Sequence, residues 1–141
     1  MKSKKQSLGG DMKLKIKLIG INSQEIDYKI CFKINQELNI DLERTDDIEV
    51  FNQKLNVMGS YSTFFYEDED EMLEFMLIAN YHPAGLLLYD AGKYDYFLRI
   101  SGEIDFIDGK EIAKKLRNIN SVIFSAEMNV DHLKSKENLF L

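Results

Sequence analysis

The sequence predicts an α+β protein with an antiparallel sheet of about five to six strands and two main helices packed on one face. Strand-like segments cluster in the middle of the chain, whereas a helical spacing of apolar residues occurs near each end. A chain of 141 residues with 45% hydrophobic residues is sufficient for one core. We therefore expect a single domain over residues 12–141. The polar, basic residues 1–11 are expected to form a disordered tail, and both Met1 and Met12 stand as candidate starts.

The first strand is expected at residues 12–19, where apolar and lysine side chains alternate with the period of a half-buried strand. Gly20 is expected to end this strand. Asn22 or Ser23 then caps a helix, and the spacing of Asn22 and Glu25 suits a capping box. The apolar stripe of this helix repeats at fourfold spacing and comprises Ile26, Ile30, Ile34 and Leu38.

The middle of the chain predicts a β meander. Residues 41–49 are rich in acids and indicate a loop that leads into a short strand at 48–51. The aromatic and β-branched content predicts further strands at 60–66, 72–81, 86–89 and 94–101. The acidic run 67–71 connects the first two of these strands, and a turn containing Pro83 follows the second.

The last part of the chain predicts one helix and one strand. Asp108 is expected to cap the helix, with Glu111 three residues later. The buried stripe of this helix comprises Ile112, Ala113, Leu116 and Ile119. Residues 122–128 then predict the final strand, after which Asp131 caps a short terminal turn.

The most distinctive segment is 85–98. An apolar run meets Asp90, a short turn contains Gly92, and the pair Asp95 and Tyr96 heads the next strand, which together indicate a hairpin. This segment resembles the one that names the IPExxxVDY family of small bacterial proteins, found mainly in the Bacteroidetes. Further similar segments lie at 27–32, 42–48, 77–80 and 133–139, so the resemblance covers roughly residues 12–141.

Within the family signature, this chain differs at three positions: Tyr89 stands for proline, Asp90 for glutamate and Tyr94 for valine. The acidic charge and the pair Asp95 and Tyr96 are kept. The resemblance implies no particular activity, because the family has none assigned to it.

Composition disfavours several classes of function. A net charge of −6 disfavours general nucleic-acid binding and binding to anionic membranes. No apolar run approaches the roughly 20 residues that span a bilayer, and the segment 14–21, broken by Lys15 and Lys17, does not suit a signal peptide. A single cysteine, Cys31, excludes an internal disulfide framework. These observations together lead us to expect a cytoplasmic protein.

Catalysis and cofactors are not expected. His82, His132 and Cys31 are far apart in the sequence and do not form a metal-binding motif. The run 67–71 lacks the glycine of a calcium-binding loop, and no glycine-rich loop has the pattern that binds phosphate. Cys31 lies beside the apolar helix stripe and is predicted to be a core residue.

The candidate interaction residues are Asp90, Tyr94, Asp95, Tyr96 and Arg99. If Tyr96 faces the core, Asp95 points to the other face of its strand, where it either pairs with a nearby cation (Arg99 or Lys93) or recognises a partner. The first hypothesis is an adaptor that binds an unidentified protein through the outer face of the sheet or an edge around 85–98. The alternative is a small-molecule-binding protein or small enzyme with its site near that hairpin. A homodimer is left open.

Overall fold

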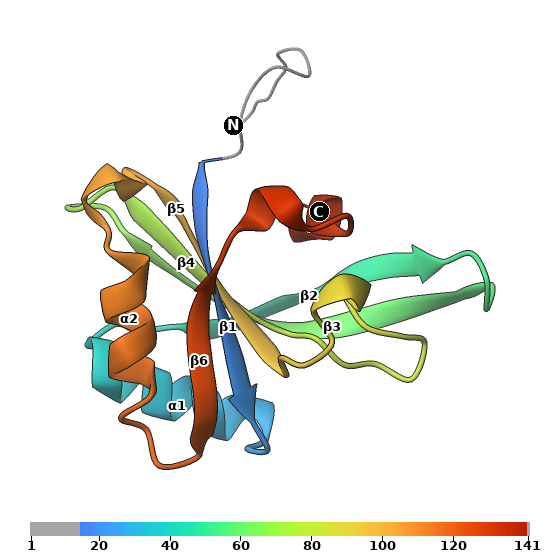
Figure 1. The fold of residues 1–141 in the computed structure, drawn as a ribbon, viewed down its shortest axis with the longest axis horizontal. Coiled ribbons are helices and arrows are strands. Elements are labelled where there is room, and N and C mark those ends of the chain that lie inside the picture. Colours follow the sequence, from blue (N-terminus) through green and yellow to red (C-terminus); the bar gives the residue numbers. More distant parts are fainter. Residues whose placement is uncertain (1–14, 141) are drawn as a thin grey trace.

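The computed structural model describes residues 15–140, shown in Figure 1. The tail predicted for residues 1–11 lies outside this range. The strands are β1 (Ile16–Ser23), β2 (Glu43–Asn52), β3 (Val57–Asp68), β4 (Leu73–Ala79), β5 (Tyr96–Gly102) and β6 (Val122–Met128), and the helices are α1 (Asp27–Leu38) and α2 (Gly109–Leu116). The strands form one six-stranded antiparallel sheet in the order β2-β3-β4-β5-β1-β6. This arrangement confirms the predicted α+β class.

Both helices cover the same face of the sheet (Figure 1). Helix residues Ile30 and Ile34 of α1, together with Leu116 of α2, pack there against Ile21 and Leu98 of the central strands. The Asp108 side chain accepts hydrogen bonds from the backbone N–H groups of Lys110 and Glu111, which confirms its predicted role as the cap of α2.

The start of α1 differs from the prediction. Asn22 and Ser23 still belong to β1, and the N-cap of the helix is Ile26, whose side chain is exposed and makes no capping hydrogen bond. The predicted capping box therefore does not form. Asn22 instead donates from its side chain to the Lys93 carbonyl at 2.8 Å, which ties the end of β1 to the segment before β5.

Strand β1 is buried on both faces, not half-buried as its alternating sequence suggested. It lies between β5 and β6, and consecutive residues Leu18 and Ile19 are both fully buried. Gly20 does not end the strand but sits under the ring of Tyr94. A Cβ atom at position 20 would lie 2.7 Å from ring carbons of Tyr94, so this close approach requires glycine.

The second face of the sheet is covered by irregular segments. They are the connection between β4 and β5 and the C-terminal segment 129–140, which lie on the opposite side from the helices in Figure 1. Leu87 and Leu88 from the connection and Leu139 from the C-terminal segment pack there against Phe97 of β5. A second apolar core results, and this is why β1 and β5 are buried on both faces.

The strand predicted at 86–89, and with it the hairpin, is wrong, whereas the strand predicted at 94–101 occurs as β5. Residues 86–88 are irregular and lead into a short 3₁₀ helix, Tyr89–Ala91. The cause is Asn80, a fully buried residue whose side chain accepts from the Leu88 N–H at 2.8 Å and donates to the Tyr94 carbonyl at 2.9 Å. These bonds give backbone groups of the connection hydrogen-bond partners without a neighbouring strand, so the apolar residues of the connection can cover the sheet.

Of the two predictions for the end of the chain, one is right and one is wrong. The last strand occurs at Val122–Met128, as predicted. The terminal turn that follows is a 3₁₀ helix at Val130–His132, and its cap is Asn129, whose side chain accepts from the Asp131 N–H at 3.0 Å. The prediction that Asp131 is the cap is therefore wrong.

None of the helices formed by residues 15–140 has both the length and the apolar character needed to cross a membrane.

Candidate protein-binding edge

The five candidate interaction residues all make contacts within the protein. Asp90 binds the C-terminal segment, because its carboxylate accepts from the Lys134 N–H at 2.6 Å and from the Ser135 hydroxyl. Desolvation opposes the charged form of this carboxylate, but the hydrogen bonds, that from Ser135 foremost, outweigh it and lower the pKa of Asp90. Asp90 thus anchors the segment that covers the second core.

The tyrosines of this set are buried. The Tyr94 ring stacks on Phe124 with 6.4 Å between centroids, and the Lys93 ammonium lies 5.2 Å from its centroid. The Tyr96 hydroxyl donates to the Glu25 carbonyl at 2.6 Å, and burial raises the pKa of Tyr96 to about 12. Neither ring is available as an exposed aromatic surface.

Asp95 and Arg99 have separate roles. The Asp95 carboxylate accepts from the Ser23 N–H at 2.8 Å. The Arg99 guanidinium donates to the Leu139 carbonyl and lies 5.9 Å from the centroid of Phe140, and burial lowers its pKa. Within residues 15–140, Asp95 forms no ion pair with Arg99 or Lys93, so the pairing considered from the sequence is not found.

Replacing Asp95 by Ala should therefore lower the free energy of unfolding by about 1–3 kcal/mol, because the buried Ser23 N–H loses its acceptor. Asp95→Asn is the matched control, since its side-chain oxygen can still accept this bond, and it should cost less. Urea unfolding of both variants measures the difference. Equal losses would show that the charge of Asp95, not its hydrogen bond to Ser23, matters for stability.

Cys31 is a buried residue of α1, and desolvation raises the pKa of its thiol to about 11. A thiol with a raised pKa is poorly nucleophilic at neutral pH. Among residues 15–140, no group of three or more histidine, cysteine or acidic side chains is placed to hold a metal ion.

We expect a thiol reagent at pH 7.5 to label Cys31 only after denaturant is added. The measurement is the labelled fraction over time, by mass spectrometry, with the unfolded protein as the control. Rapid labelling of the folded protein, with a rate that saturates below pH 8, would contradict the burial of this thiol.

A different part of the molecule has the features of an interaction surface. Strand β2 is at the edge of the sheet, and within residues 15–140 it pairs with β3 alone. Its register shifts between Thr45 and Ile48, which places a β-bulge at Asp46 and Asp47. The bulge reverses which residues face the helices: Arg44 lies over the ring of Phe64 on the helix side, whereas Ile48 packs into the second core.

The bulge is held by Asp47. This carboxylate accepts from the Ser60 hydroxyl at 2.7 Å and forms an ion pair with Arg44 at 2.6 Å. The hydrogen bond from Ser60 is the largest effect on the pKa of Asp47 and lowers it. Burial opposes this, but the contact with Arg44 lowers the pKa further. Since Arg44 is thus engaged, it is not free to neutralise the other acids of this strand.

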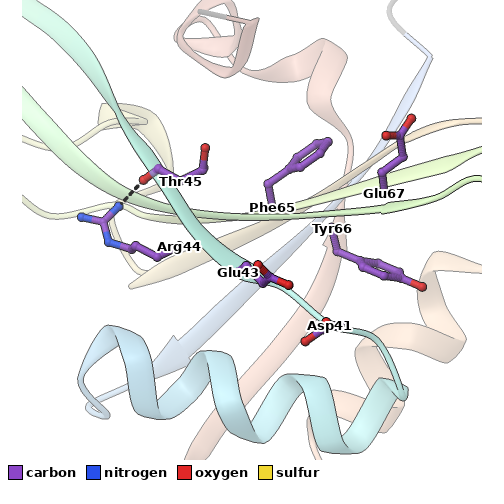
Figure 2. Close-up of a pocket in the computed structure, with 7 residues that line it drawn as sticks. All are labelled: Asp41, Glu43, Arg44, Thr45, Phe65, Tyr66 and Glu67. Carbon is purple, nitrogen blue, oxygen red and sulfur yellow. Dashed lines mark hydrogen bonds between the residues drawn. The ribbon is translucent and has the colours of Figure 1, made fainter.

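Two hollows follow the edge around the bulge. The first, of about 430 Å³, is shown in Figure 2, where side chains from the start of β2, the turn before it and the end of β3 surround the edge. The second, of about 630 Å³, shares Arg44 and Thr45 with the first. The acids that line one or both hollows are Asp41, Glu43, Asp46, Asp47, Glu49 and Glu67. The edge therefore has a strongly acidic rim.

Beyond the bulge, β2 and β3 form an arm that extends past the rest of the molecule (Figure 1). Phe51 of β2 and Met58 of β3 are directly opposite each other. They lie on the helix side of the sheet, because Val50, between Glu49 and Phe51, packs on the other side. Neither of the described helices, α1 and α2, lies over the arm (Figure 1). Phe51 is 49% exposed and Met58 50% exposed. The arm thus presents an exposed apolar pair, one member of which, Phe51, is on the edge strand.

Sequence reasoning missed this arm because the acids of 41–49 indicated a loop. A signal was present in the sequence. Apolar residues lie on both sides of the mainly polar segment 52–56, in the order Val50, Phe51, then Val57, Met58, which is typical of a hairpin. What the sequence could not reveal is that the helices leave one face of this hairpin uncovered.

No family model matches the chain, and neither the curated proteins nor the solved structures that were searched include a match. The resemblance to the IPExxxVDY family remains a prediction.

Proposed function

We propose that this protein is a non-catalytic, cytoplasmic protein-binding module that contacts its partner through the β2 edge and the arm. The observation that supports this most is the half-exposed pair of Phe51 on β2 and Met58 on β3, since within residues 15–140 the outer side of β2 has no neighbouring strand. Exposed backbone groups on an edge can pair with another chain. Large apolar side chains such as Phe and Met are enriched at protein interfaces.

The alternative, a small-molecule site or small enzyme around 85–98, gains no support from this geometry. The polar groups of Asp90, Asp95 and Arg99 bind backbone or side chains of their own chain. Small-molecule sites are usually lined by apolar side chains with a few polar groups. The hollows at β2 are instead lined mainly by charged residues along an edge, which better suits contact with a macromolecule.

The proposal is tested by comparing the proteins captured by three tagged chains expressed in the native host. Phe51→Ser removes the exposed ring from the arm, whereas Phe106→Ser removes a ring that is 93% exposed at a different end of the sheet. We expect Phe51→Ser to lose specific proteins that the wild-type chain and Phe106→Ser both retain. Equal urea midpoints for all three chains exclude unfolding as the cause. An identical set of captured proteins for all three would refute the arm as a binding surface.

A further inference from the structure

We propose that the outer edge of β2 binds an extended partner segment in which basic and apolar residues alternate, and that this segment adds a seventh strand to the sheet. The inference rests on the proposed function and specifies its partner. The backbone of β2 supports such pairing over Ile48, Glu49, Val50, Phe51 and Asn52, whose register with β3 is unbroken. In an edge strand, alternate residues direct their N–H and C=O groups away from the sheet, where a new strand can pair with them.

The bulge limits how far this strand can extend. At Asp46 and Asp47 the register shifts, so a partner segment cannot continue in ladder pairing past Ile48. Bulges of this kind protect edges from unspecific pairing between sheets. The regular part of the edge is therefore short, and side chains must supply the remaining specificity.

The two faces of this short edge differ in chemistry. Glu49 and Phe51 are exposed on the helix side, whereas Ile48 and Val50 face the second core and are shielded to a greater extent. Successive side chains of an added strand point to opposite faces. A lysine or arginine beside Glu49 can form a cross-strand ion pair and lay its aliphatic stem or its charge on the Phe51 ring. An apolar residue at the next position extends the surface beside Val50.

Charge decides what kind of segment fits. Glu43, Asp46 and Glu49 are exposed, and among the described residues none of them forms an ion pair. The one cation on β2, Arg44, is paired with Asp47, and Lys54 lies in the turn beyond the strand. A second copy of β2 would bring acids opposite acids, which is unfavourable. A basic segment from another protein is the complementary occupant.

The other edge of the sheet is less suited to this role. Strand β6 exposes Ile123 and Phe124, but the side chain of Arg117, the C-cap of α2, already donates to the Ser125 carbonyl of that strand at 2.6 Å. Its acid, Glu127, is paired with Lys17 at 3.6 Å. Of the two edges, β2 is the one that carries several acids outside any ion pair among the described residues.

The test uses the full chain and a fluorescent, acetylated ten-residue peptide of alternating lysine and valine, with binding followed by fluorescence polarisation. A peptide of alternating glutamate and valine is the control for charge. Glu49→Lys reverses the charge at the centre of the edge. Asp105→Lys makes the same change in net charge at an exposed position in the segment after β5. Sedimentation of the free chain reports its oligomeric state.

We expect the lysine peptide to bind, the glutamate peptide not to bind, and Glu49→Lys to weaken binding by at least about tenfold, because like charges then lie opposite each other. Asp105→Lys should change the affinity by less than about twofold. Equal weakening by both variants, equal binding of both peptides, or no binding would overturn the proposal. A dimer of the free chain that the peptide dissociates would also overturn it, since the edge would then belong to a second copy. If the peptide fails but Phe51→Ser still loses captured proteins, the added strand is refuted and the proposed function stands.

Discussion

Replacing Phe97 by Ala should lower the free energy of unfolding by about 3–5 kcal/mol. Phe97 lies in the central strand β5 and is fully buried. Its ring packs in the second core with Leu87, Leu88 and Leu139, and it meets the Tyr94 ring edge-to-face at 6.1 Å between centroids. Removal of the ring leaves a cavity that strands and loops on both sides must line.

The control for this prediction is the neighbouring residue. Leu98 is also fully buried but faces the helices, and Leu98→Ala should cost about 2–5 kcal/mol. Urea unfolding with an unchanged dependence on denaturant gives both values. If the sheet were covered on one face only, just one of the two variants would lose this much stability. A loss below about 1 kcal/mol for Phe97→Ala would show that the irregular segments do not form a true core.

Replacing Gly20 by Val should also destabilise the protein, by about 1–3 kcal/mol or more. The added Cβ would lie 2.7 Å from Tyr94 ring carbons, and the ring cannot move freely because it stacks on Phe124 and touches Phe97. The β1 backbone cannot withdraw either, since it pairs with strands on both sides.

A double-mutant cycle tests the cause. In a Tyr94→Ala background the space above position 20 is open, so Gly20→Val should cost much less there than in the wild-type chain. Urea unfolding of the four proteins gives the coupling free energy. Strictly additive losses would mean that the Tyr94 ring is not what requires glycine at this position.

Local chemistry made part of the fold predictable. The cap at Asp108 and the burial of Ala113 and Leu116 on α2 depend on neighbours in the sequence, and both occur, although Ile119 lies beyond the end of the helix. The strand at 122–128 also follows from a local signal, a period of two. The run of acids correctly predicted a connection between two strands, although Glu67 and Asp68 still belong to β3 and the connection is 69–72. These features are decided within a few residues, where pattern and propensity are informative.

Other features depend on tertiary contacts. The run 86–89 has the composition of a strand, but the buried side chain of Asn80 satisfies its backbone and turns it into a cover for the sheet. In the sequence, Gly20 indicates the end of a strand. Its actual role, to leave room for the ring of Tyr94, depends on a residue far away in the sequence. A strand that is covered on both faces has no solvent-exposed face, so a period of two in its sequence does not reveal how it is buried.

The site was harder to predict than the fold. Asp90, Asp95 and Arg99 are polar residues in the most distinctive segment, and polar residues there suggested recognition. Each of them instead joins parts of the chain that are far apart in sequence. The exposure of Phe51 and Met58 follows from where the two helices lie over the sheet, which no local pattern at 48–58 contains.

The binding role of the β2 edge is tested most directly by amide hydrogen exchange with and without the lysine–valine peptide. If the edge receives a strand, outward-facing amides within 48–52 should exchange at least about tenfold more slowly when the peptide is bound, because they become hydrogen-bonded. Amides of the opposite edge, Val122–Met128, and of the segment 85–98 should be unchanged. Protection at either of those places, with none at 48–52, would contradict the assignment of β2 as the binding edge.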